Sequence, residues 1–175
     1  HSVSLSSEGS RVAIGGYLND SNGYNSGNAR IFEYSSGSWN QLGDDINGEA
    51  ESDQLGTSVS LSSDGVRVAI GAPFNDGTGS DAGNVRIYEY NGNSWAQVSE
   101  IGGEAADDYS GMSVSLSSDG SMVAIGAPGN DGSSGGAGHV RVYSISSEEE
   151  TTYVPDDNFE QAQIDLGYDD VMDDY

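Results

Sequence analysis

The sequence predicts an all-β protein, an array of four-stranded antiparallel blades in which one structural unit is repeated three times. The segment Ser-Val-Ser-Leu-Ser-Ser begins at Ser2, Ser58 and Ser113, which gives a period of 55 to 56 residues. Val-Ala-Ile-Gly then follows each time, first at Val12. A fixed period of this length, with several landmarks in the same order, indicates a repeat architecture.

Each repeat contains four short predicted strands, seen most clearly in the second copy. These strands cover residues 58–62, 67–71, 84–90 and 95–98. Asp64-Gly65 and Asn91-Gly92 are the turn pairs typical of β-hairpins. Four strands in this length match a propeller blade. A continuous β-solenoid is the competing architecture, although its repeat is usually shorter and needs fewer hairpin turns.

The repeats divide the chain into three blades and a tail. The blades are expected at residues 1–56, 57–111 and 112–147, and the acidic tail at residues 148–175. The third copy is predicted to be incomplete, because it stops after Tyr143 and lacks the tryptophan of the other two. A propeller ring usually holds about four to eight blades. We therefore expect a partial β-propeller, either as a piece of a longer protein or as chains that assemble through open strand edges.

Three segments of the second repeat resemble a known family. They are Gly-Thr-Ser-Val-Ser-Leu at 56–61, Val-Ala-Ile-Gly-Ala-Pro at 68–73 and Ala-Gly-Asn-Val-Arg-Ile-Tyr at 82–88. They are similar to the FG-GAP repeat of integrin α-subunit β-propellers and related secreted proteins, and the similarity extends over residues 1–147. The resemblance implies a propeller fold, an extracellular or cell-surface location and a role in adhesion. For function it is a weak guide, because one fold serves many activities.

Calcium is the one cofactor that the resemblance suggests. In calcium-binding members of the family, the turn between the first two strands is a long loop rich in Asp and Asn. Here that turn is Ser-Ser-Asp64-Gly65 or its equivalent. One carboxylate per turn cannot supply the roughly six to eight oxygens that Ca²⁺ needs. The calcium sites of the family are therefore not expected in these turns.

The loop after Gly-Ala-Pro is the other place where a cation could bind. Its candidate calcium ligands are Asn75, Asp76, Asp81, Asn130 and Asp131. Asn, Asp and Gly also favour turns, because the short polar side chains bond to nearby backbone and Gly accepts positive φ. Turn formation is the favoured interpretation, and bound calcium is the alternative.

The charge of the chain excludes several classes of partner. There are 29 acidic residues against 5 basic ones, a formal net charge of -24, and all five basic residues are arginines. A chain of this charge repels phosphate backbones and anionic lipids, so we expect no nucleic acid partner and no membrane insertion. The arginines recur at equivalent repeat positions, at Arg11 and Arg67 and at Arg30, Arg86 and Arg141. We therefore expect them to connect strands or blades.

The tail differs from the repeats in composition and pattern. Residues 148–175 contain eleven acidic residues and no basic one. Pro155 and the residues after it resemble a helix start, and near-helical apolar spacing continues until Gly167, which predicts a short helix over 158–166. Residues 153–169 resemble the cap that precedes leucine-rich repeats in secreted bacterial surface proteins. That similarity implies the start of a further domain.

The sequence gives little support for catalysis. It contains no His-Glu-x-x-His and no phosphate-binding loop with its lysine. Glu49 and Glu104 recur within Gly-Glu-Ala, and a recurring residue is more plausibly structural than catalytic. Trp39 and Trp95 also recur, which favours packing between blades over a sugar-stacking surface. We therefore expect a protein that is not an enzyme.

The expected function is binding or adhesion outside the cell. Repeated loops would contact a protein or carbohydrate ligand at the cell surface, each contact weak alone and strengthened by the others. One alternative is a structural subunit of an extracellular filament or sheath, in which open blade edges pair between chains. Another is an ancillary module of a secreted carbohydrate-active enzyme.

Overall fold

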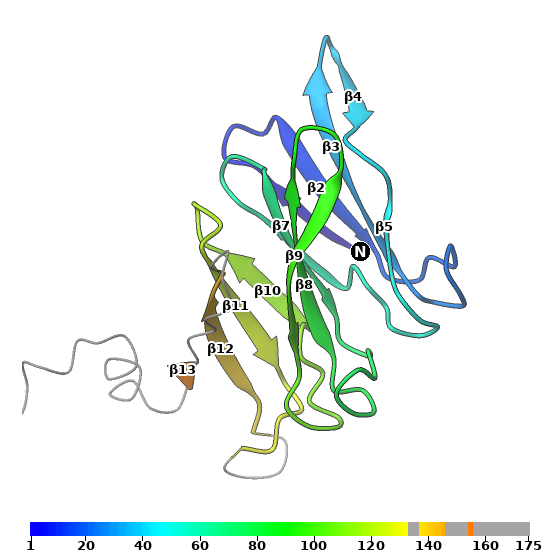
Figure 1. The fold of residues 1–175 in the computed structure, drawn as a ribbon, viewed down its shortest axis with the longest axis vertical. Helices are drawn as coiled ribbons and strands as arrows, with labels where there is room; N and C mark the ends of the chain where they lie inside the picture. The colour runs from blue at the N-terminus through cyan, green and yellow to red at the C-terminus, as the bar shows by residue number, and fades with distance from the viewer. Residues whose placement is uncertain (133–136, 146–153, 156–175) are drawn as a thin grey trace, which may run out of the picture.

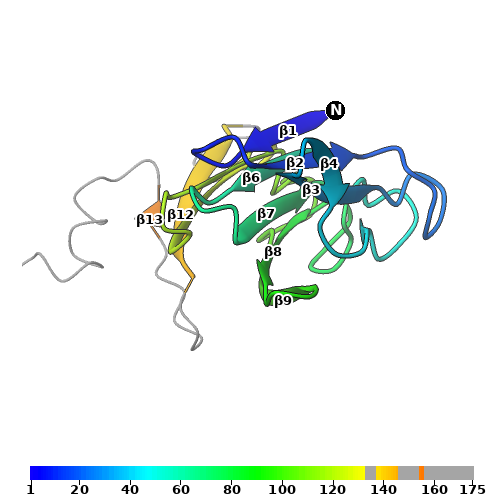
Figure 2. The same ribbon diagram turned by 90° about the horizontal axis from the view of Figure 1, so that it is seen from above.

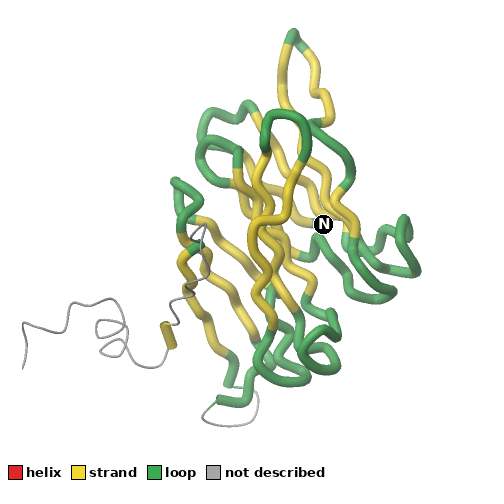
Figure 3. Tube along the Cα trace, viewed as in Figure 1, coloured by secondary structure: helices red, strands yellow, loops and turns green. Residues whose placement is uncertain are grey.

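In the computed structural model, residues 1–132, 137–145 and 154–155 are described, and they form three antiparallel sheets (Figures 1 and 3). Blade 1 contains β1 (Ser2–Leu5), β2 (Arg11–Gly16), β3 (Asn28–Ser35), β4 (Ser38–Gln41) and β5 (Ile46–Asn47). Blade 2 contains β6 (Ser58–Leu61), β7 (Arg67–Ala72), β8 (Asn84–Tyr90) and β9 (Trp95–Gly102). Blade 3 contains β10 (Ser113–Leu116), β11 (Met122–Ala127), β12 (His139–Ser144) and β13 (Val154–Pro155). The predicted all-β array of antiparallel blades is confirmed, and these residues include no helix able to cross a membrane.

The first two strands pair in the same register in every blade. Ser2 lies opposite Gly15, and the pairs one and two repeats later lie opposite each other in the same way. The hairpin turn of blade 3 shows how the short Ser-Ser-Asp-Gly connection is held. The Oδ1 atom of Asp119 accepts hydrogen bonds from the Ser117 hydroxyl at 2.6 Å and the Ser121 amide at 3.0 Å. These bonds lower the pKa of Asp119 to about 2, so the carboxylate stays charged and stabilises the turn.

The fourth strand differs between the blades. β9 runs without a break along β8, with a bulge at the Ile87/Tyr88 step. Blade 1 has one more residue in the corresponding stretch, and there the strand is divided into β4 and β5. In blade 3 the fourth strand is β13, which pairs with β12 and comes from the segment assigned to the tail. The predicted helix over 158–166 lies outside the described residues, as does nearly all of the segment that resembles a leucine-rich-repeat cap.

The three sheets are stacked one on the next (Figure 2). Strand β6 lies between β1 and β10 and contacts both. Alternate residues of a strand therefore point toward the preceding or the following blade. In β7, Ile70 packs toward blade 1 and Ala69 packs toward blade 3. We call these two sides the leading face, toward the preceding blade, and the trailing face, toward the following blade. Only blade 2 has both faces covered by blades of the described structure.

The serines of Ser-Val-Ser-Leu explain how one blade is held to the next. The Ser4 hydroxyl of β1 accepts a hydrogen bond from the Leu61 amide of β6 at 2.9 Å. The Ser60 hydroxyl of β6 accepts one from the Leu116 amide of β10 at the same distance. Valine and leucine occupy the leading face, and serine on the trailing face satisfies a backbone donor of the next blade. The alternation in the sequence therefore serves both faces of the strand.

Leucine at one repeat position provides a matched test of this arrangement. Leu61 is 7% exposed against blade 1, whereas Leu5, at the same position of blade 1, is 61% exposed. We expect Leu61→Ala to lower the free energy of unfolding by about 2 to 4 kcal/mol, because it opens a cavity between blades. Leu5→Ala should change it by less than about 0.5 kcal/mol. Urea denaturation of both variants measures the difference, and equal losses would contradict the burial assigned to the two faces.

Candidate functional site

Long loops gather at one end of the stacked blades, along the right and lower side of Figure 1. We call this surface the loop end. It consists of residues 17–27, 73–83 and 128–132, which follow the second strands, and residues 48–57 and 103–112, which lead into the next blade. The two kinds of loop run side by side: the Gln54 amide donates to the Asn25 carbonyl at 3.1 Å, and the Tyr109 amide donates to the Asp81 carbonyl at 3.1 Å. The loop end therefore repeats the same pairing of loops.

The backbone of the loop end is held in conformations that most residues avoid. Six of the seven described non-glycine residues with positive φ lie here, as repeat-equivalent pairs: Asn25 and Asp81, Ser52 and Asp107, Gln54 and Tyr109. Asn and Asp tolerate this region, whereas Ser, Gln and Tyr adopt it at a cost in free energy. Such conformations persist only where the surrounding structure fixes them, and they are frequent at binding sites.

Asn75 and Asn130, two of the candidate calcium ligands, take part in contacts between blades. The Nδ2 atom of Asn75 donates to the Oδ2 atom of Asp53 at 3.0 Å, and Asn130 donates to Asp108 in the same way. Both asparagines are buried. The Oδ1 atom of Asn75 also accepts the Gly77 amide at 2.9 Å. These side chains therefore support turns and join neighbouring loops.

The acidic candidates lie on the surface of the same loops. The Oδ1 atom of Asp76 accepts the backbone amide of Asp81 at 2.9 Å. Partial burial, together with the nearby carboxylates of Asp76 and Asp107, raises the pKa of Asp81. Asn130 and Asp131 belong to the next blade. Within the described part of the chain, no group of three or more His, Cys, Asp or Glu side chains is placed to hold a metal ion. Calcium binding by these loops stays a prediction.

Asp53 and Asp108 are structural parts of these loops that the sequence analysis did not identify. Besides accepting from the asparagines, Asp53 accepts the Ala50 amide at 3.0 Å and Asp108 accepts the Ala105 amide at 3.0 Å. Each is almost fully buried. The signal was present, because each aspartate stands four residues after the glutamate of a Gly-Glu-Ala segment.

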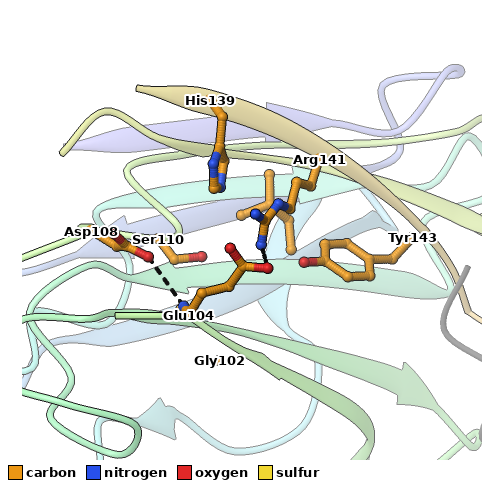
Figure 4. Close-up of a pocket in the computed structure, with 9 residues that line it drawn as sticks. Gly102, Glu104, Asp108, Ser110, His139, Arg141 and Tyr143 are labelled. Carbon is orange, nitrogen blue, oxygen red and sulfur yellow. Dashed lines mark hydrogen bonds and ion pairs between the residues drawn. The ribbon is translucent and has the colours of Figure 1, made fainter. Parts of the chain in front are cut away.

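Buried arginines join each blade to the loop of the preceding one. Nη1 of Arg86 lies 3.2 Å from Oε1 of Glu49, which joins blades 1 and 2. Arg141 pairs with Glu104 in the same way between blades 2 and 3, where Figure 4 shows the two side chains facing each other with His139 and Tyr143 nearby. A buried cation needs such a partner, because leaving it unpaired costs several kcal/mol. The predicted connecting role of these arginines is confirmed.

A second set of contacts joins the blades at the opposite end. Arg11 bonds to Glu33 of its own sheet at 2.8 Å and to the Gly65 carbonyl of blade 2 at 3.1 Å. Further out, the indole Nε1 of Trp95 donates to the Leu42 carbonyl of blade 1 at 2.7 Å. Packing between blades is therefore confirmed for Trp95. The equivalent Trp39 is 47% exposed.

The repeated sheets and their contacts agree with a comparison against protein families. Residues 47–88 match the family model of the FG-GAP repeat. The chain carries an FG-GAP repeat. The resemblance to the FG-GAP repeat is confirmed, and the matched stretch covers β6, β7 and most of β8 with the loop that precedes them. The search of curated protein sequences found no match.

Solved structures similar to this chain have the same blade architecture. A putative 6-phosphogluconolactonase from Bacteroides fragilis matches with a TM-score of 0.58, 11% identity and coverage of 87% of this chain and 36% of that chain. A putative 6-phosphogluconolactonase from Bacteroides uniformis matches with a TM-score of 0.56, 13% identity and coverage of 87% of this chain and 39% of that chain. The β-propeller domain of Cps50 (Swd1) from Myceliophteria thermophila matches with a TM-score of 0.53, 13% identity and coverage of 87% of this chain and 36% of that chain. The chain spans less than two fifths of each, and at such identities the likeness shows the fold alone. The described residues therefore have the blade fold of a β-propeller, and one stretch of the chain matches the FG-GAP repeat.

The contact between Asn75 and Asp53 can be tested against its counterpart in blade 1. Asn19 accepts a turn amide at 2.9 Å as Asn75 does, but it contacts no aspartate of a preceding blade in the described structure. We expect Asn75→Ala to cost about 1 to 3 kcal/mol more unfolding free energy than Asn19→Ala, because it leaves a buried carboxylate short of a donor. Chemical denaturation measures this difference. Equal costs would show that only the turn bond matters.

The raised pKa of Asp81 predicts how one loop responds to pH. The folded protein binds the Asp81 proton more tightly than the unfolded chain does. Ionisation of this group therefore destabilises the fold as pH rises from the ordinary aspartate pKa of 3.8 through the raised pKa. Asp81→Asn removes the charge and keeps a residue that tolerates positive φ. The variant should gain stability over the parent as pH increases through this window. Thermal unfolding of both proteins over a pH series measures the gain, and a constant difference would contradict the prediction.

Proposed function

We propose that this chain is a non-catalytic binding module of an extracellular or cell-surface protein, and that its loop end contacts a protein or carbohydrate ligand. One observation carries the proposal: the strained backbone of the loop end recurs at equivalent positions in consecutive blades. Strain of this kind costs free energy and is frequent where a loop must present a fixed surface. The FG-GAP repeat supports the location, since the resemblance is to integrin α-subunits and related secreted proteins.

The charge of the loop end indicates the chemistry of the ligand. Asp20, Glu51, Asp76 and Asp107 are all exposed there. The arginines beneath them are buried in pairs with Glu49 and Glu104, so they present little positive charge to solvent. A ligand with basic groups, or a sugar surface whose hydroxyls donate to carboxylates, suits this surface. Several weak contacts through equivalent loops would add up to a useful affinity.

The repetition of the same contacts in successive blades also supports a role other than catalysis. The most buried charged residues are Arg86 and Arg141 with the aspartates Asp53 and Asp108, and each recurs one repeat later in the same contact. A catalytic constellation is normally unique, whereas groups that join repeats recur with them. This reasoning favours a binding module over a catalytic role of the kind named for the putative lactonases, to which the likeness is one of fold alone.

Two exposed glutamates at opposite ends of the molecule make a matched test. Labelled chain is passed over a glycan array and over immobilised extracellular-matrix proteins, with calcium and with EDTA. Glu51→Gln at the loop end should weaken binding roughly two- to fivefold, as expected for one exposed charge. Glu8→Gln, in the hairpin turn at the other end, should leave binding unchanged. Equal effects of the two variants, or hydrolysis of 6-phosphogluconolactone by the chain, would contradict the proposal.

A further inference from the structure

The leading face of a blade has a defined set of partners in this molecule. In blade 2 the face consists of Val59, Leu61, Val68, Ile70 and Tyr88, which pack on blade 1 as one apolar cluster. Three polar donors surround this cluster: the Arg86 guanidinium, the Asn75 amide and the Trp95 indole. Each donor finds its acceptor on blade 1 or on the loop that leaves it. The interface between blades 1 and 2 therefore defines the contacts that a covered leading face makes: an apolar cluster and three donors with acceptors on the preceding blade.

The same face of blade 1 is open. Ile14 is 40% exposed, whereas its equivalent Ile70 is 0% exposed. Val3, Leu5 and Leu18 are also exposed large apolar side chains. A groove lies on this face, and its lining includes Ile14, Leu18 and Arg30. Contiguous exposed apolar surface on a soluble domain generally marks an interaction site.

Arg30 carries the charge that such a site would use. Its equivalents Arg86 and Arg141 pair with a glutamate of the preceding blade. Arg30 pairs instead with Asp45, in the connection between β4 and β5 of its own blade, at 2.7 Å. Its side chain is 44% exposed, whereas that of Arg86 is 3% exposed. The hydrogen bond from Arg30 lowers the pKa of Asp45. Arg30 is therefore a cation at the edge of an apolar groove, in the position where a glutamate is bound one repeat later.

Two further donors on blade 1 have the same relation to their equivalents. Within the described structure, no acceptor is found for the side-chain amide of Asn19, whereas that of Asn75 donates to Asp53 at 3.0 Å. Trp39 likewise has no indole acceptor among the described residues, whereas Trp95 donates to the Leu42 carbonyl. The Cβ position of Gly9 has nothing within 4 Å, although that of Gly65 is covered by the Arg11 side chain.

We propose that the leading face of blade 1 is an inter-blade interface, and that its occupant is a further blade of the same repeat, placed before β1 as blade 1 is placed before β6. The occupant has a stated chemistry. In both internal interfaces the glutamate stands nine residues, and the aspartate five residues, before the first serine of the next blade, as Glu49 and Asp53 do before Ser58. The occupant therefore presents a glutamate to Arg30, an aspartate to Asn19 and a main-chain carbonyl to Trp39.

Other occupants fit this face less well. An apolar ligand would cover Ile14 and Leu18 but would not match three donors placed at the spacing of the repeat. A second copy of this chain would bring together two molecules of formal net charge -24, whose repulsion opposes association. This inference concerns the leading face of blade 1, which meets the loop end only at Leu18 and Asn19. It does not rest on the proposed function and can fail independently.

The test adds one blade to the whole chain. Residues 1–56 are placed directly before His1, so that the added Gly56 precedes His1 as Gly56 precedes Thr57 in the parent. Trp95 of the original chain and Trp39 of the added blade are replaced by Phe, which leaves the original Trp39 as the reporter. We expect its emission to shift to shorter wavelength and its quenching by acrylamide to fall, compared with the one-copy chain that carries Trp95→Phe.

Matched substitutions separate docking from other causes. Glu49→Gln with Asp53→Asn in the added blade should return Trp39 toward the accessibility it has in the one-copy chain. The same pair of substitutions in the original blade affects the interface with blade 2, and Trp39 should keep its protected state. Limited proteolysis reports whether the added blade is folded.

Three results would overturn the proposal. One is a folded added blade with Trp39 as accessible as before. Another is an added blade that stays protease-sensitive while the original chain is resistant, which would mean that the face does not accept a blade. The third is a one-copy chain whose mass by light scattering rises with concentration and falls back to the monomer with Ile14→Asp, because the occupant would then be a second copy.

Discussion

A four-stranded sheet with apolar residues on both faces is stable only between two neighbours, and the rest of this structure depends on that constraint. Because alternate residues of β7 point to opposite sides, Ala69 and Ile70 can be removed from water only by two different blades. Burial of this area is the main favourable term in folding. Stability in such an array comes from each blade and from the contacts to the next one. The polar contacts then determine how consecutive blades are placed.

The ionic contacts between blades act mainly on register. Removing the Arg86 guanidinium from water is costly, and its pairing with Glu49 offsets much of that cost without a large net gain. A blade shifted along its neighbour would leave the arginine buried and unpaired. Ser4 adds a second constraint, since its hydroxyl meets the Leu61 amide in one alignment of the strands. The pairs thus penalise wrong alignments more than they stabilise the right one.

The sequence was sufficient to predict where the strands lie, but not which residues of neighbouring blades their side chains contact. The alternation around Ser58 and the Asp64-Gly65 turn fix two strands by local preference, and both were found where predicted. Leu5 and Leu61 have identical local sequences, so only the stacking distinguishes the exposed one from the buried one. For the same reason the sequence could not show that Asn75 bonds to a residue of another blade. Such a contact depends on the path of two loops that are far apart in the chain.

The same residues that shape the loop end also hold neighbouring blades together. Asp53 joins its own turn to Asn75 of the next blade, and the same loop carries Glu49, which holds Arg86. The strained residues Ser52 and Gln54 lie beside Asp53, so their unusual φ values persist because the interface holds both sides of the loop. Blade 1 has no such contact on its leading face within the described structure, and its loop after β2 is fixed from one side only. A ligand that bridges loops of adjacent blades would therefore find a rigid surface at each internal interface, and an added blade would complete the same support for the first loop.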